Sequence, residues 1–191
     1  MRKFPWIVLL ALPIAIAGID ELAILPMDHA AIQYTNGPVH NRVSDLQQQL
    51  ARGVVKLSHK QELGYLPSLL QALQMPQSSQ VLVFSKTSFQ APKIAPRTPR
   101  ALYHSDDVAV GFVRGGDVLE IAAVDPQQGV VFYTLDQWES PRPNLVRRGE
   151  CFQCHVGTST LGVPGLVVRS VHVERSGMAL LNAPAFVTAV H

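Results

Sequence analysis

The chain has 191 residues, of which 47% are hydrophobic and 16% charged, a composition typical of a globular protein with enough apolar material for one core. Arg2 and Lys3 alone account for the formal net charge of +2, so the remainder is neutral overall. A neutral chain without a basic stripe is not expected to bind nucleic acid.

The first residues predict an export signal. Two basic residues precede an apolar run that ends near Ile16, and Ala15 and Ala17 form the small-x-small pattern that signal peptidase cleaves. The run is shorter than the ~20 residues that a membrane-spanning helix needs. We therefore expect residues 1–17 to be removed, leaving a periplasmic or otherwise exported protein without a stable membrane span. An uncleaved N-terminal anchor is the alternative.

Two helices are expected before residue 76. Asn41 can cap a helix over NRVSDLQQQLARG, and Gly53 stands where that helix would stop. A second helix over GYLPSLLQALQMP has Pro67 in its first turn and Pro76 beyond its end. The apolar residues recur at helical spacing, as Val43, Leu46 and Leu50 in the first helix and Leu66, Leu69, Leu70 and Leu73 in the second.

After the second helix the pattern favours strands. Residues 80–87 are rich in β-forming side chains, residues 106–113 and 117–124 flank an Arg-Gly-Gly turn, and residues 130–135 follow the turn DPQQG. The stretch 90–107 contains three prolines and is expected to be an extended loop. The chain is therefore predicted to be α+β, with N-terminal helices, an antiparallel β meander of about four strands, and then a C-terminal segment.

The two cysteines of the chain lie in GECFQCHVG, at Cys151 and Cys154, directly before His155. At this spacing they cannot form a long-range disulfide, which leaves a redox-active dithiol, a zinc site or covalent haem attachment. A redox dithiol normally sits early in its fold, and a zinc site usually needs a second pair of ligands at similar spacing. The pattern C-x-x-C-H is the signal for haem attachment, which takes place outside the cytoplasm and so agrees with export.

The segment CFQCH resembles the attachment site of the c-type cytochromes. The resemblance implies one covalently attached haem c, with Cys151 and Cys154 as thioether positions and His155 as the axial ligand of the iron. LGVPGL, residues 161–166, is similar to the loop that passes the proximal histidine in such proteins. There a carbonyl, at Pro164 or a neighbour, would accept the hydrogen bond of the imidazole, although a simple turn is an equal alternative. A sheet followed by a late CxxCH is similar to the non-helical c-type haem families, such as the c-prime-beta proteins.

The second axial position of the iron decides the class of function. Met178 lies at a spacing compatible with a Met/His pair, which favours electron transfer, and a core methionine is the alternative interpretation. The other candidates are His172, His104, His59, His40, His29 and His191, followed by Met27 and Met75. An open position could instead bind a small ligand or reduce peroxide. The polar cluster to consider in that case is Arg100, Tyr103, His104, Asp106 and Asp107.

Three segments are predicted: a signal peptide over 1–17, an α+β domain over 18–140, and a haem-attachment segment over 141–191. Residues 137–148 are expected to connect the last two, and the haem segment is too short to enclose its cofactor without the sheet. The expected function is electron transfer with redox partner proteins, and no catalytic residue is assigned. A haem enzyme or sensor with an open distal site and a non-haem thiol oxidoreductase are the alternatives. The apolar end PAFVTAVH raises the further expectation of a truncated chain.

Overall fold

The computed structural model describes residues 26–190, so the expected signal peptide and His191 lie outside the described residues. The fold is α+β, as predicted. The helices are α1 (Arg42–Ala51), α2 (Leu66–Ala72) and α3 (Phe152–His155), with short 3₁₀ turns at Gln77–Ser79, Ala91–Lys93 and Thr158–Thr160. None of the helices in residues 26–190 has the length and apolarity that crossing a membrane requires.

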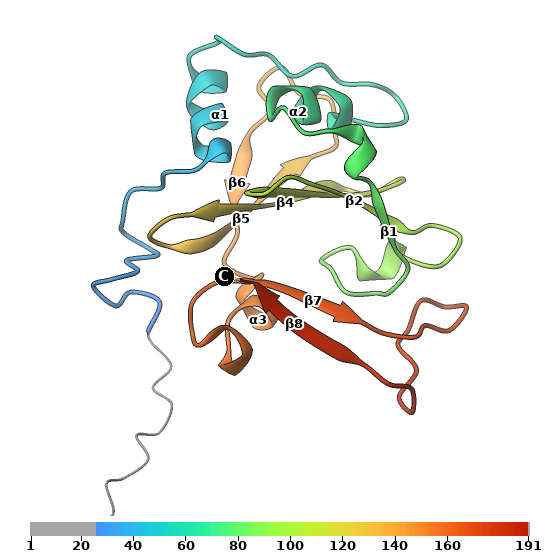
Figure 1. Ribbon diagram of the computed structural model, residues 1–191. Coiled ribbons are helices and arrows are strands. Elements are labelled where there is room, and N and C mark those ends of the chain that lie inside the picture. Colours follow the sequence, from blue (N-terminus) through green and yellow to red (C-terminus); the bar gives the residue numbers. More distant parts are fainter. Residues whose placement is uncertain (1–25, 191) are drawn as a thin grey trace, which may run out of the picture.

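A six-stranded antiparallel meander follows the first two helices, and each strand pairs with the next in sequence. Its strands are β1 (Val81–Val83), β2 (Arg100–His104), β3 (Val108–Val113), β4 (Val118–Asp125), β5 (Gly129–Asp136) and β6 (Leu145–Arg147). A separate hairpin of β7 (Leu166–Ser170) and β8 (Phe186–Val190) ends the fold. Helices α1 and α2 cover one face of the large sheet, and α3 and the hairpin lie on the other side (Figure 1).

The two long helices form where the sequence predicts them. The side-chain oxygen of Asn41 accepts hydrogen bonds from the backbone N–H groups of Val43 and Ser44, which caps the start of α1. Beyond its end, Gly53 adopts a φ of +69°, a conformation that favours glycine. The apolar residues of α1 and α2 pack on the sheet and form the core, in which Val43, Leu46, Leu66, Leu69, Leu70 and Leu73 are buried.

Two strands lie where the sequence predicted none. Residues 90–107 were expected to be a loop, but β2 forms directly after the last proline and pairs with β1 and β3. Proline excludes helix but not a strand that begins after it, and the alternation of Ala101 and Tyr103 with outward residues supplies a buried face. Similarly, β6 lies within the predicted connector 137–148 and pairs with β5. The main sheet therefore extends past the boundary expected near residue 140.

Candidate functional site

Both cysteines and His155 lie on a single helical turn. Cys151 stands at the N-cap of α3, and its carbonyl accepts hydrogen bonds from the N–H groups of Cys154, at 3.2 Å, and His155, at 3.1 Å. Both thiols are free, with Cys151 half-buried and Cys154 exposed. The turn therefore presents two unblocked sulfur atoms next to one imidazole.

Contacts with the main sheet and with the segment before α1 fix the position of this turn. After β6, the N–H of Arg148 donates to the carbonyl of Phe132 at 2.8 Å, and its side chain donates to Thr134 Oγ1, also at 2.8 Å. The ring of Phe152, in α3 itself, packs edge-on against Tyr34, with ring centroids 4.8 Å apart. These contacts join α3 to strand β5 and to the segment that precedes α1.

The His155 ring has a fixed orientation. Its Nδ1 lies 2.9 Å from the carbonyl oxygen of Gly165, and because a carbonyl only accepts, Nδ1 carries the hydrogen. The N–H of Gly165 in turn donates to the His155 carbonyl at 3.0 Å. Nε2, the other ring nitrogen, is then the one with a lone pair for a metal. The sequence predicted that the carbonyl of Pro164 or of a neighbour would accept this hydrogen bond, and in the structure the acceptor is Gly165.

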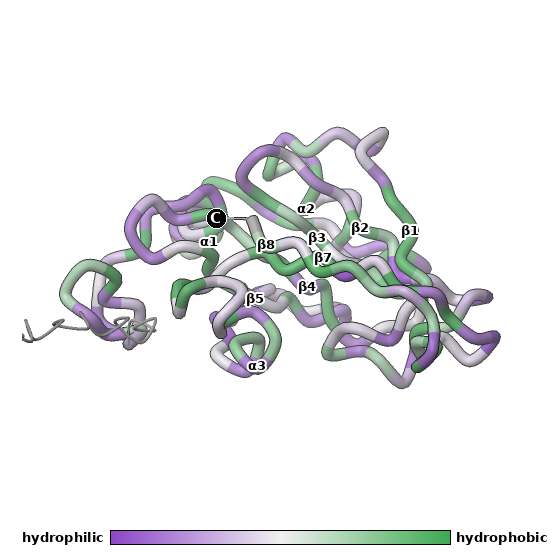
Figure 2. Tube along the Cα trace, turned by 60° about the horizontal axis from the view of Figure 1, so that its bottom comes forward, coloured by the Kyte–Doolittle hydropathy of each residue, from purple (hydrophilic) through white to green (hydrophobic). Residues whose placement is uncertain are grey.

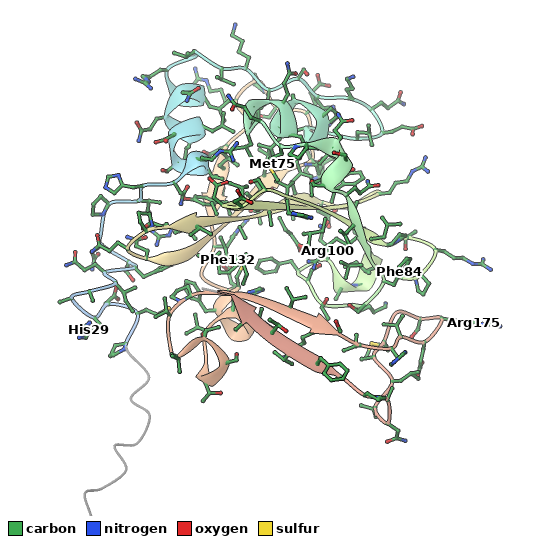
Figure 3. The ribbon with its side chains drawn as sticks, viewed as in Figure 1. His29, Met75, Phe84, Arg100, Phe132 and Arg175 are labelled. Carbon is green, nitrogen blue, oxygen red and sulfur yellow. The ribbon has the colours of Figure 1, made fainter. Side chains whose placement is uncertain are left out.

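The loop that supplies this carbonyl is anchored on the sheet. The Pro164 carbonyl accepts a hydrogen bond from the N–H of Val130, at the start of β5, at 2.8 Å. From the same strand, Phe132 points to the side of the hairpin, and its ring centroid lies 4.7 Å from that of His155 (Figure 3). Strand β5 thus positions the imidazole both through its backbone and through an aromatic side chain.

Burial keeps the imidazole neutral. Desolvation lowers the pKa of His155 below its ordinary value of 6.5, the Gly165 carbonyl opposes that shift, and the nearby Arg100 charge adds to it. A neutral imidazole is the form that can bind a metal.

The lowered pKa predicts a pH dependence of the haem-free protein. The unfolded chain binds a proton at His155 near pH 6.5, whereas the folded chain binds it only at lower pH. The free energy of unfolding should therefore be fully developed above that pH and fall as the pH decreases below it. Urea titrations between pH 8 and 5 should show a shallower decrease for His155→Gln than for the wild type. Equal slopes would contradict the assignment.

The Cys151 thiol is difficult to ionise. Burial raises the pKa of the Cys151 thiol to about 12, and the negative charges of Glu120 and Glu150 contribute to the shift. Cys151 is therefore a protonated thiol at neutral pH. A reactive dithiol of the thioredoxin type would instead need a lowered thiol pKa.

The structure assembles no ligand set for zinc. Among residues 26–190, no group of three or more His, Cys, Asp or Glu side chains is arranged to hold a metal ion. A closed structural zinc site needs four such donors. Two surface hollows are lined by other segments, one next to α2 and the other by residues that include Phe84, Arg97 and Arg175.

Within residues 26–190, the residues predicted as distal ligands lie on separate segments of the fold. Met178 lies beyond the far end of β7, a strand about 17 Å long at ~3.3 Å per residue, and is 55% exposed, so it is not a core methionine either. Met75 belongs to the core on the helix side of the sheet, and Met27 packs against the same core. The histidines within the described residues are dispersed, at His29 and His40 before α1, His59 before α2, His104 at the end of β2 and His172 after β7.

The predicted polar cluster is divided between the two faces of the sheet. Tyr103 is buried in the core, and its hydroxyl accepts a hydrogen bond from the Gln80 side chain. Asp107 is bound by Arg42 of α1 at 2.8 Å. Arg100 points to the side of the hairpin, like Phe132 (Figure 3). Of this cluster, Arg100 and His104 are the residues that the alternation of β2 places on the face toward α3, and His104 pairs with Ala109 in the same row as Phe132.

No protein-family model, curated protein or solved structure matches this chain. The proposed function therefore rests on the C-x-x-C-H motif and on the geometry around it.

Phe132 was not singled out from the sequence, nor was Glu120, the partner of Arg100. Strand β5 is buried on both faces, so its sequence shows no polar alternation that could have placed Phe132 on the face opposite the core. The sequence contains no signal for the contact between that ring and His155, because it depends on how α3 returns to the sheet.

Proposed function

We propose that this chain is an exported c-type haem protein with one covalently attached haem c, and that it transfers electrons to or from redox partner proteins. Cys151 and Cys154 would hold the haem by thioethers, and His155 would be its axial ligand. The observation that carries the proposal is the hydrogen bond from His155 Nδ1 to Gly165, on the same turn that presents both thiols. It leaves Nε2, the appropriate donor atom, to the metal.

The donor set fits this cofactor. Each thiol can add across one vinyl double bond, forming a C–S and a C–H bond, so attachment consumes no oxidant or reductant. The exposed Cys154 is the more accessible thiol, and the half-buried Cys151 lies one helical turn before it. Residues at positions i and i+3 of a helical turn are neighbours, so both sulfur atoms can reach one edge of a flat ring.

The surroundings of His155 suit an electron-transfer ligand. The bound haem would supply an iron that changes by one electron between its ferrous and ferric states. The Gly165 carbonyl fixes the imidazole and increases its basicity, which stabilises the ferric state relative to the ferrous. Phe132 covers one side of the ring and excludes water from it.

The thiol oxidoreductase alternative has less support. Such an enzyme attacks through the first cysteine of its motif as a thiolate, and the pKa of Cys151 is raised to about 12. The same protonated thiol is compatible with addition to a vinyl group during assisted attachment.

Expression of the full chain with a cytochrome maturation system tests the proposal. We expect haem that stays with the polypeptide on a denaturing gel and adds the mass of one haem to the secreted chain. A secreted product without haem, with both thiols free or joined to each other, would contradict it. The same analysis determines whether residues 1–17 are removed.

A second candidate function rests on the dispersed distal ligands. Within residues 26–190, Met178 is exposed beyond the far end of β7 and the other histidines lie on separate segments, which favours an open iron position that binds a small ligand. The absorption spectrum of the loaded protein distinguishes the two functions. Low-spin bands that carbon monoxide leaves unchanged indicate a second strong ligand, and high-spin bands that carbon monoxide shifts indicate an open site.

A further inference from the structure

An ion pair lies on the face of the main sheet that is turned toward α3. Arg100 Nη1 of β2 and Glu120 Oε2 of β4 are 2.9 Å apart, and their side chains are only 17% and 15% exposed. The pair spans strand β3 at Gly111, where a Cβ would lie 3.4 Å from both Arg100 Cδ and Glu120 Oε2. A glycine there lets the two side chains lie flat across three strands.

The ion pair leaves hydrogen-bonding capacity unused. Arg100 Nε and Glu120 Oε1 are buried and have no hydrogen-bond partner. A buried polar atom without a partner costs folding free energy, and a buried ion pair is at best a weak source of stability. The Arg100 guanidinium therefore has an N–H group without a hydrogen-bond partner. Two apolar side chains in place of Arg100 and Glu120 would stabilise the fold more.

The ion pair adjoins the candidate site. Glu120 pairs directly with Thr134 in the β4–β5 ladder, and Phe132 lies on the same face two residues before Thr134. The Phe132 ring contacts His155. The charges also act on the site, because Glu120 raises the pKa of Cys151 and Arg100 lowers that of His155.

Next to the row of Glu120 and Thr134, the same face of the sheet presents small side chains in line with Phe132. Ala122 pairs with Phe132, and Ala109 pairs with Ala122, so the three share one face of the sheet. Both alanines are half-buried rather than covered. Small residues on a sheet face leave a flat apolar surface, which suits one side of a planar ring. In β2 this row ends at His104, which pairs with Ala109, and Arg100 lies on the same face at the other end of that strand.

We propose that Arg100 binds a carboxylate of the tetrapyrrole held by the CxxCH turn, and that Glu120 keeps the guanidinium in place. The inference rests on the proposed function. The planar fork of an arginine can hold two acidic partners at once, so Arg100 can bind a carboxylate without releasing Glu120. Arg100 is thus a positioning residue for the cofactor and not an iron ligand.

Binding of a haem analogue to the full chain, purified without haem, tests this role. Iron mesoporphyrin has ethyl groups in place of vinyl groups and so cannot form thioethers, and its dimethyl ester also lacks the carboxylates. The wild type should bind the free acid about tenfold or more tightly than the ester, since a hydrogen bond to a charged group has roughly that value. Arg100→Gln should abolish the preference by weakening binding of the free acid alone.

Two further variants control the experiment. Arg169→Gln also removes a positive charge that acts on His155, but Arg169 is exposed on β7, and the preference should remain. Glu120→Gln removes the charged partner that keeps the guanidinium in place, so the preference should decrease without vanishing, and this variant decides the question if Arg100→Gln does not fold. A wild type that binds both compounds equally, or binds neither, would overturn the proposal, as would an Arg100→Gln variant that keeps the preference. Covalent haem attachment is measured in a separate experiment on the matured chain. The proposed function can therefore hold even if Arg100 does not bind the carboxylate.

Discussion

Alanine in place of Gly129 is expected to destabilise the haem-free protein by about 3 kcal/mol and to disturb the site around His155. Gly129 has a φ of +74°, in the left-handed region that residues with a Cβ avoid. A Cβ there would also lie 2.4 Å from the Pro164 carbonyl oxygen and 2.9 Å from Val163 Cγ1. The loop would have to move away from β5, and the Gly165 carbonyl that holds the imidazole would move with it.

Urea unfolding monitored by circular dichroism measures the loss. Gly53→Ala is the matched control, because Gly53 has a similar φ of +69° but no heavy atom within 4 Å of the added Cβ. That variant should lose only the backbone contribution, about 1 kcal/mol. Equal losses in the two variants would mean that the contact between the loop and β5 contributes nothing to stability.

The second large effect concerns the two thiols. Replacement of both Cys151 and Cys154 by serine should abolish covalent haem attachment altogether, because serine hydroxyls do not form stable thioether-like links to the vinyl groups. Each single replacement should leave one thioether and shift the absorption bands of the reduced haem, because one vinyl group stays unsaturated. Intact-mass measurement and a haem stain after denaturation report the outcome.

Gln153 provides the control for this experiment. It is exposed and lies between the two cysteines on the same turn, so Gln153→Ala should keep full attachment. Haem that remains bound to the double serine variant after denaturation would exclude thioether attachment. Loss of haem from Gln153→Ala as well would point to a misfolded turn instead of a missing bond.

The helices and most strands could be predicted because their signals are local. Asn41 caps α1 within three residues of itself, and α2 shows its buried face as leucines at helical spacing. Strand β2 could not be predicted in the same way. Its five residues follow a proline-rich stretch, and its place in the sheet depends on ladders with β1 and β3, which lie before and after it in the chain.

The same distinction between local and long-range signals applies to the candidate site. The spacing of Cys151, Cys154 and His155 is visible in the sequence because it is contained in one turn of helix. The partners of that turn are distant in sequence: Phe132 comes from β5, and Arg100 from a segment interpreted as a loop. Met178 shows the opposite case. Its spacing from His155 along the chain suggested an iron ligand, but the residue lies in the loop at the far end of the β7–β8 hairpin.

The hairpin itself stands apart from this framework. Val168, Phe186 and Val187 expose more than half of their surface, and both strands appear largely hydrophobic in Figure 2. A two-stranded hairpin has little stability by itself, so its alignment depends on its attachments to the rest of the fold. At the far end, the N–H of Lys86 donates to the Gly177 carbonyl at 2.9 Å, and at the near end a short loop leads from α3 into β7.

That loop is fastened almost entirely by peptide groups. The bonds from Val130 to Pro164 and between Gly165 and His155 use main-chain atoms except for one imidazole nitrogen. Because every residue type offers the same carbonyl, and all but proline the same amide, most side chains along the loop are free to diverge over evolution while the histidine keeps its orientation. Thr160, whose buried hydroxyl bonds to Gly157, and Val163, which packs against the core, are the exceptions. Selection would act instead on the absence of a side chain at Gly129, so related proteins could share this architecture with little more than a five-letter motif and one glycine in common.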